Sequence, residues 1–264
     1  MSKVRLYGRI ARLLATVGLG LLVAGTMTLV ERLHLRNESL IRQRLTRWYL
    51  ARLSAALPFT IEVRGSLPKQ PMLWISNHVS WTDIPLLGML APLSFLSKAE
   101  VRTWPVAGWL AKKAGTLFIR RGSGDSALLG QQLLAHLQQQ RSLLIFPEGT
   151  TTDGRQLRTF HGRLLSSAIE AGTALQPVAI RYVRNNQIDT EIAPFVGDDD
   201  LISHLLRLLS SDVASVRIHL LEPIETVGAS RNVLAKQAHR AIGFALFGET
   251  EAVEVEEQGT DLAA

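Results

Sequence analysis

The sequence predicts an α/β fold, a sheet layered with helices, preceded by an N-terminal hydrophobic and amphipathic membrane-binding helical segment. Three observations predict it. From residue 58 onward, short apolar runs alternate with stretches of helical periodicity. A long apolar run lies near the N-terminus, and arginines recur at helical spacing after it. The 264 residues therefore divide into a membrane-anchoring segment at 1–57, a main domain at 58–247 and an acidic, disordered tail at 248–264.

The anchoring segment contains eighteen consecutive uncharged and mostly apolar residues at 13–30. This length is at the lower limit for a helix that spans a bilayer, so a tilted span and an interfacial or re-entrant segment both fit. Lys and Arg flank both ends of the run, and the positive-inside rule therefore gives no orientation. Apolar and Arg positions then recur at helical spacing between 32 and 57, which predicts an amphipathic helix with a basic face.

The main domain alternates between segments of strand and of helical character. The predicted strands are 60–63, 72–76, 93–97, 116–119, 143–146, 175–183 and 216–221. The predicted helices are 84–90, 106–114, 126–140, 162–171, 201–209 and 232–247. This alternation indicates an α/β sheet layered with helices, and in such folds the ends of the strands carry the chemistry.

Composition and charge narrow the classes of partner. The chain is 47% hydrophobic, which fits a peripheral or singly anchored protein better than a polytopic one. It has no cysteine, so disulfides and thiolate nucleophiles are excluded. The tail carries six acidic residues and no Lys or Arg, and without it the net charge of +6 becomes about +12. Because the basic residues lie beside the longest apolar run, we expect membrane lipids as partners and no nucleic acid.

The sharpest local motif, at 76–83, follows a predicted strand and leads into a predicted helix. Its His78 is of the residue type best suited to take a proton from an alcohol near neutral pH, and a carboxylate such as Asp83 could orient the ring. Five residues of separation place the two about 140° apart on a continuous helix, so the chain must turn between them. Taken alone, the motif is explained more simply by a helix cap at Asp83 and a surface histidine.

Two further motifs also follow predicted strands. The segment 146–152 is a turn whose exposed amides and one carboxylate could hold a polar acceptor or an oxyanion, although Pro-Glu-Gly also suits an ordinary tight turn. The segment 115–121 ends a strand in two arginines, which could grip a phosphate or remain solvated.

Together these motifs resemble the glycerolipid acyltransferase family, which includes the 1-acylglycerol-3-phosphate acyltransferases. The family's first block, Asn-His-x-Ser-x-x-Asp, is matched by Asn77, His78, Ser80 and Asp83. The second block, Gly-x-x-Phe-Ile-x-Arg, is matched by Gly115, Phe118, Ile119 and Arg121. The third, Phe-Pro-Glu-Gly-Thr-Arg-Ser, is matched as far as Thr150, and a weaker fourth, an apolar strand around a proline, by the strand around Pro177. Four blocks in the family's order are far more specific than any one of them.

The resemblance implies an acyltransferase domain and a mechanism. His78 would act as general base on the hydroxyl of a lyso-lipid, Asp83 would orient His78, and the alkoxide would attack the thioester of acyl carrier protein or coenzyme A. These thioesters are co-substrates, and neither a metal nor an organic cofactor is implied. The residues expected to bind substrate are Asn77, Ser80, Phe118, Arg121, Glu148, Gly149, Thr150 and Thr151. The expected location is the inner (cytoplasmic) membrane, with the site facing the cytoplasm.

One departure from the family pattern bears on the acceptor. Relatives that act on lysophosphatidate usually carry Arg after Glu-Gly-Thr, whereas this chain carries Thr151. Arg155, Arg158 or Arg163 could supply the missing charge, while the following residues look like relatives that acylate lyso-ornithine lipid, which has no phosphate. From the sequence, 1-acyl-sn-glycerol-3-phosphate is the first expectation and lyso-ornithine lipid the alternative.

Other classes of protein fit the sequence less well. A serine lipase needs a Gly-x-Ser-x-Gly elbow, which the chain does not contain. A zinc hydrolase needs clustered ligands, whereas the seven histidines are scattered. An inactive membrane-binding protein would have no use for His78 and Asp83 together.

Overall fold

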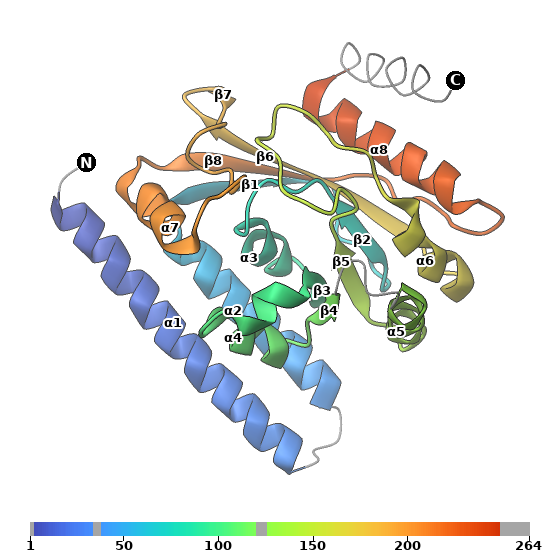
Figure 1. Cartoon of the computed structure of the whole chain (residues 1–264), viewed down its shortest axis with the longest axis horizontal. Coiled ribbons are helices and arrows are strands. Elements are labelled where there is room, and N and C mark those ends of the chain that lie inside the picture. Colours follow the sequence, from blue (N-terminus) through green and yellow to red (C-terminus); the bar gives the residue numbers. More distant parts are fainter. Residues whose placement is uncertain (1–2, 34–37, 120–125, 249–264) are drawn as a thin grey trace.

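A mixed β-sheet runs through the structure, a computed structural model that describes residues 3–33, 38–119 and 126–248 (Figure 1). Within these residues the strand order is β1-β8-β6-β2-β5-β3-β4, and β7 pairs with β6. All pairs are parallel except those of β6 with β7 and β8. The strands are β1 (Phe59–Arg64), β2 (Leu73–Ser76), β3 (Leu93–Lys98), β4 (Leu117–Ile119), β5 (Ser142–Ile145), β6 (Leu175–Arg184), β7 (Gln187–Ile188) and β8 (Ala214–Leu220).

Helices cover both faces of this sheet (Figure 1). They are α1 (Lys3–Arg32), α2 (Glu38–Ala56), α3 (Asp83–Gly88), α4 (Ala107–Lys113), α5 (Ser126–Gln138), α6 (Ser166–Ala171), α7 (Leu201–Ser210) and α8 (Arg231–Phe247), with 3₁₀ turns η1 (Ala99–Thr103) and η2 (Gly162–Leu165). Because successive residues of a strand point to opposite faces, Leu73 and Ile75 of β2 join the core beneath α5, α6 and α8, and Trp74 joins the core beneath α2 and α3.

The long N-terminal helix α1 lies against the body, beside α2, α4 and α7. Its buried residues recur every three or four positions, as one face of a helix requires: Arg9, Leu13, Thr16, Gly20, Ala24 and Met27. Arg9 donates to the carbonyl oxygens of Leu209 (2.8 Å) and Ser211 (2.5 Å), and Arg12 donates to that of Ala56 (3.1 Å). The helix is long and apolar enough to cross a membrane, by length and composition alone.

The α/β fold with an N-terminal apolar helix is therefore confirmed, and every strand and helix predicted after residue 58 has a counterpart in the structure. The segment 162–171 is divided between η2 and α6, and the short strand β7 and the turn η1 escaped prediction. Helix α1 begins ten residues before the apolar run at 13–30, since the body supplies carbonyl partners for its arginines. Most of the acidic tail, 249–264, lies outside the described residues.

Candidate active site

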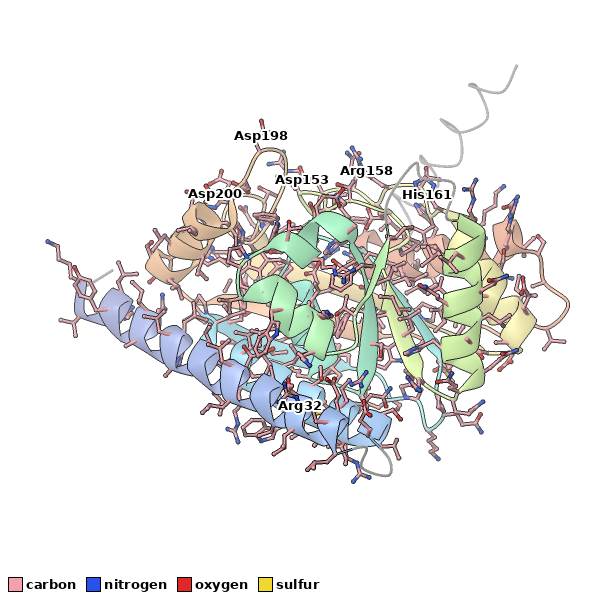
Figure 2. All side chains as sticks on the ribbon, turned by 60° about the horizontal axis from the view of Figure 1, so that its bottom comes forward. Arg32, Asp153, Arg158, His161, Asp198 and Asp200 are labelled. Carbon is pink, nitrogen blue, oxygen red and sulfur yellow. The ribbon has the colours of Figure 1, made fainter. Side chains whose placement is uncertain are left out.

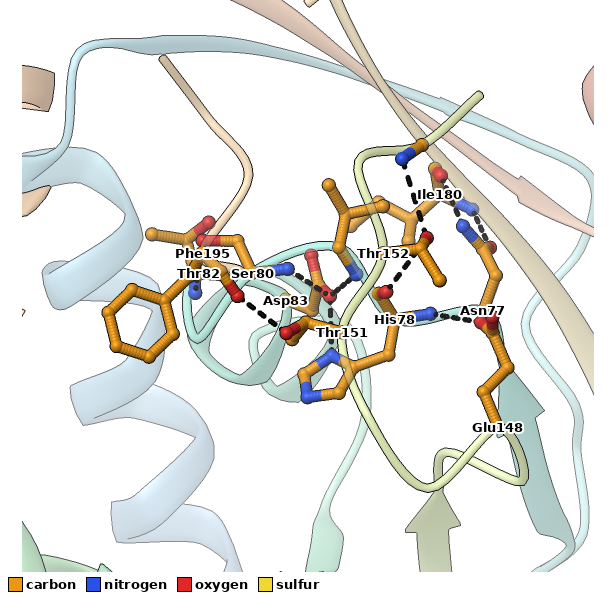
Figure 3. A network of polar contacts seen from close by, with 12 residues as sticks. Asn77, His78, Ser80, Thr82, Asp83, Glu148, Thr151, Thr152, Ile180 and Phe195 are labelled. Carbon is orange, nitrogen blue, oxygen red and sulfur yellow. Dashed lines mark hydrogen bonds and ion pairs between the residues drawn. The ribbon is translucent and has the colours of Figure 1, made fainter. Parts of the chain in front are cut away.

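Two of the motifs meet because β2 and β5 are parallel neighbours in the sheet. The segments that follow the two strands, 77–83 and 146–152, leave the same edge of the sheet and lie side by side (Figure 3). Two backbone contacts join the motifs directly: the Thr152 amide donates to the His78 carbonyl oxygen over 2.9 Å, and the His78 amide donates to the Glu148 carboxylate over 2.8 Å. The sheet thus brings together segments about 70 residues apart in the chain.

His78 and Asp83 form a hydrogen-bonded pair, with 2.8 Å between His78 Nδ1 and Asp83 Oδ2. The chain turns between them, and the same Oδ2 accepts the amides of Val79 (2.8 Å) and Ser80 (3.0 Å). Asp83 is fully buried, whereas the His78 side chain remains 18% exposed. A carboxylate accepts hydrogen bonds only, so the proton lies on Nδ1 and leaves Nε2 as the ring nitrogen that can take a proton.

The backbone and ring of this histidine are fixed from several sides. The Asn77 side chain exchanges two hydrogen bonds with the backbone of Ile180 in β6, each of 2.9 Å. The His78 ring stacks on Phe146 with 3.8 Å between ring centroids and 10° between planes. The site is therefore pre-organised by β5 and β6.

Glu148 is buried and acts as a clasp between two segments of the site. Its Oε1 accepts the His78 amide over 2.8 Å, and its Oε2 accepts the Arg158 amide over 2.9 Å. Burial raises the pKa of Glu148 to about 7, although both amide bonds oppose that shift by stabilising the carboxylate. The next residue, Gly149, has φ +72°, a conformation that glycine adopts without strain.

A polar hollow of about 280 Å³ is lined in part by the end of the 146–152 turn. Its lining comprises Thr150, Thr151, Thr152, Asp153, Gln156, Arg158, Val196 and Gly197. The Thr151 hydroxyl donates to the Phe195 carbonyl oxygen and so ties the turn to the 193–197 loop. Of the three arginines considered as replacements for the missing cation, Arg158 lines this hollow, whereas Arg155 bonds to Thr190 (3.2 Å). Figure 2 shows Asp153, Arg158 and His161 along one side of the molecule, with Arg32 near the opposite side.

An apolar cavity of about 400 Å³ lies beside the motif that carries His78. It is lined by side chains of α1, α2, η1 and α4, and also by Trp81 and Ile84. The Trp81 indole N–H donates to Nδ1 of the fully buried His204 over 3.0 Å, and His204 Nε2 lies 3.1 Å from the Ala193 carbonyl oxygen. Burial lowers the pKa of His204, so the ring stays neutral and can accept the indole proton.

The other residues predicted to bind substrate occupy varied positions. Ser80 is fully buried within the turn, and Asn77 is nearly so. Phe118 lies on β4 at the edge of the sheet, separated from β2 by β5 and β3. Arg121 lies outside the described residues. Substrate contact by these side chains stays a prediction.

Sequence reasoning missed Tyr182 and His204. The Tyr182 hydroxyl lies 2.6 Å from Asp83 Oδ1. The sequence did contain one signal: Val178, Ile180 and Tyr182 alternate along β6, which places all three side chains on the face of the sheet that carries α3. Within the described part of the chain, no group of three or more His, Cys, Asp or Glu side chains could hold a metal ion.

A histidine is hydrogen-bonded to a buried carboxylate, and its motif and the neighbouring turn contribute to the linings of an apolar cavity and a polar hollow. Such an arrangement suits an enzyme that activates a hydroxyl group and accommodates an apolar substrate. Comparison with known proteins agrees. The model of the family described as Acyltransferase matches residues 59–181. The lyso-ornithine lipid O-acyltransferase of Pseudomonas aeruginosa is 63% identical over 94% of this chain and 96% of its own. The chain belongs to the acyltransferase family, and the protein is an acyltransferase.

More distant relatives carry two different acceptors in their names. The 1-acyl-sn-glycerol-3-phosphate acyltransferase of Neisseria meningitidis is 35% identical over 62% of this chain and 65% of its own. The lyso-ornithine lipid O-acyltransferase of Brucella abortus is 32% identical over 81% of this chain and 87% of its own. The crystal structure of the 1-acyl-sn-glycerophosphate acyltransferase of Thermotoga maritima shares the fold, with a TM-score of 0.61 and 19% identity, over 90% of this chain and 96% of that one.

Proposed function

We propose that this enzyme transfers a fatty acyl group from a thioester carrier to the free hydroxyl of lyso-ornithine lipid, in the synthesis of a membrane lipid. The observation that carries the choice of acceptor is Thr151. Its side chain is neutral, its hydroxyl is engaged with the Phe195 backbone, and it stands where relatives acting on a phosphate acceptor usually carry Arg. The 63% identity to a lyso-ornithine lipid acyltransferase over nearly the whole chain supports the same acceptor.

The His78–Asp83 geometry supports direct transfer without an acyl-enzyme. Nε2 of His78 removes the proton of the acceptor hydroxyl while Nδ1–H stays bonded to Asp83. The alkoxide oxygen forms the new C–O bond at the thioester carbonyl, the C–S bond breaks, and the leaving thiolate takes the proton from the imidazolium. Asp83 stabilises the transient positive charge on the ring.

The apolar cavity beside Trp81 suits an acyl chain, because its lining is almost entirely hydrocarbon. Both α1 and the η1–α4 segment line this cavity, so it lies against the helix that is apolar enough to enter a membrane. The carrier, acyl carrier protein or coenzyme A, stays outside this cavity in our proposal.

Lysophosphatidate is the second candidate acceptor. Arg158 lines the polar hollow and would provide a cation for a phosphate, and the 35%-identical Neisseria relative carries this acceptor in its name. Lysophosphatidate would need a cation in this hollow to bind its phosphate, whereas lyso-ornithine lipid, which has no phosphate, would not.

The test offers membranes containing the protein each acceptor separately, with a radiolabelled acyl group carried on acyl carrier protein. We expect the kcat/KM for lyso-ornithine lipid to be at least about tenfold above that for lysophosphatidate, because the hollow lacks an arginine at position 151. Thr151→Arg restores that cation and should shift the ratio toward lysophosphatidate. His78→Ala membranes control for endogenous transfer. A wild-type preference for lysophosphatidate would replace our proposed acceptor with the second candidate.

We also propose that α1 lies along the membrane surface with both ends on the cytoplasmic side. Its arginines are bonded to body carbonyls near the N-terminal end, and Glu31 pairs with Lys113 (2.6 Å) near the other end. The face turned away from the body carries exposed apolar side chains at heptad-like spacing, Leu14, Leu21, Leu22 and Leu29. Cations flanking both ends of the run agree with two cytoplasmic ends.

The absence of native cysteine allows a direct test of this arrangement. Val4→Cys and Leu33→Cys, at positions 81% and 59% exposed, should both react with a membrane-impermeant thiol reagent in inverted membrane vesicles. Leu128→Cys on α5, 55% exposed, marks the side that the body occupies, and the cysteine-free parent gives the background. Labelling of residues 4 and 33 from opposite sides would show that α1 spans the bilayer.

A further inference from the structure

The carboxylate that holds His78 is itself held by a tyrosine that lies 99 residues further along the chain. Tyr182 is on β6, is 1% exposed, and packs its ring against Phe59 with 5.4 Å between centroids. Its hydroxyl lies 2.6 Å from Asp83 Oδ1 and 2.6 Å from the Thr82 hydroxyl. Both neighbours belong to the segment that carries His78.

The direction of these bonds follows from what each group can donate. The Asp83 carboxylate only accepts, so the single hydroxyl proton of Tyr182 goes to Oδ1. The Thr82 hydroxyl must then donate to the Tyr182 oxygen. The result is a buried relay from Thr82 through Tyr182 to Asp83, in which each bond polarises the next.

The two carboxylate oxygens of Asp83 accept hydrogen bonds from different groups. Oδ2 accepts from His78 Nδ1 and from the amides of Val79 and Ser80, while Oδ1 accepts from Tyr182. Four donors around one buried carboxylate fix the rotation of its plane. Burial, and then the neighbouring Asp83 charge, raise the pKa of Tyr182 well above its usual range, so the hydroxyl keeps its proton and remains a donor.

We propose that Tyr182 is a positioning residue for acyl transfer: it fixes the Asp83 carboxylate so that Oδ2 faces His78, and it withdraws charge from Asp83 through Oδ1. It acts through Asp83 and contacts no substrate. The inference rests on the proposed function only in assuming that the His78–Asp83 pair performs the proton transfer, and not on the identity of the acceptor.

Tyr182→Phe keeps the ring packed against Phe59 and removes one donor. We expect kcat to fall by about tenfold with the KM values for donor and acceptor unchanged, because the oriented pair acts in the transition state. The acidic limb of kcat/KM should also move to higher pH, since a carboxylate that has lost a donor attracts the imidazolium more strongly. The other ionisable groups nearby, Glu148 on the His78 amide and Asp189 paired with Arg184, are common to both proteins.

Two further variants separate positioning from stability. Thr226→Val removes another fully buried hydroxyl, one that donates to the Thr173 carbonyl oxygen over 3.2 Å away from the site, and should lower Tm while leaving kcat and the pH profile unchanged. Thr82→Val removes only the first bond of the relay, so it should shift the pH limb in the same direction as Tyr182→Phe with a smaller loss of kcat. If Tyr182→Phe fails to fold, Thr82→Val carries the test alone.

All variants are measured on the lyso-lipid that the wild-type enzyme acylates best. If the proposed acceptor is wrong, the wild-type enzyme shows it, and the kcat of each variant relative to wild type still tests the role of Tyr182. A wild-type kcat and pH profile in Tyr182→Phe would overturn the proposal, as would a loss no larger than that of Thr226→Val. An unchanged pH profile in Thr82→Val, when Tyr182→Phe cannot be measured, would also overturn it.

Discussion

Replacing His78 with alanine is expected to lower kcat for acyl transfer by roughly 10²- to 10⁴-fold, because this variant removes the proposed general base, whose Nδ1 lies 2.8 Å from Oδ2 of the buried Asp83. Asp83→Asn should lose activity to a similar order, since an amide cannot hold the same imidazole tautomer or stabilise its charge. Both variants are assayed for transfer at saturating donor, with the stability of each variant followed by thermal unfolding.

We expect the two residues to act as one unit, and a double variant tests this expectation. The double variant should be no slower than the slower single variant, because once the base is removed the carboxylate has nothing to orient. His219→Ala, at an exposed position on β8, is the matched control and should retain wild-type activity. Additive losses in the double variant would show that His78 and Asp83 contribute independently, against the pairing seen in the structure.

The pairing of His78 with Asp83 was predictable from the motif, but the backbone geometry that brings the two side chains together was not. The sequence shows five residues between His78 and Asp83 and requires a turn, whereas the turn itself is stabilised by Asp83 accepting the amides of Val79 and Ser80. Helical periodicity predicted α7, because an amphipathic pattern can be recognised within the segment itself. The antiparallel pairing of β8 with β6 depends on long-range contacts that no local pattern encodes.

The contributions of Glu148 and Tyr182 were beyond sequence reasoning for the same reason. Glu148 was expected to bind substrate, which stays a prediction, and in the structure each of its carboxylate oxygens accepts a backbone amide. The amide of residue 78 has a partner 70 residues away, and the Asp83 carboxylate has one 99 residues away. Such bonds follow from the order of β2, β5 and β6 in the sheet, which becomes known only with the fold.

Glu148→Gln is expected to lower kcat by about tenfold to a hundredfold, through the backbone of His78. The ionised carboxylate accepts from the amides of His78 and Arg158 at once, whereas a glutamine must turn its NH₂ group toward one of those two N–H groups. One of the two amide hydrogen bonds would be lost, and the His78 imidazole would move out of its position against Asp83. Glu62→Gln on β1, where the side chain is 45% exposed, serves as the control and should leave activity unchanged.

The same substitution should also remove a pH-dependent part of the free energy of unfolding. The folded-state pKa of Glu148 is raised to about 7 from 4.5, so this group favours the folded state below pH 4.5, and that contribution is lost as the pH rises through 7. A shift of this size corresponds to about 3 kcal/mol. Between pH 5 and 8, the free energy of unfolding of Glu148→Gln relative to wild type should therefore rise by up to that amount, as followed by denaturant titration. A difference that stays constant with pH would show that the pKa of Glu148 is the same in the folded and unfolded states, against the raised value.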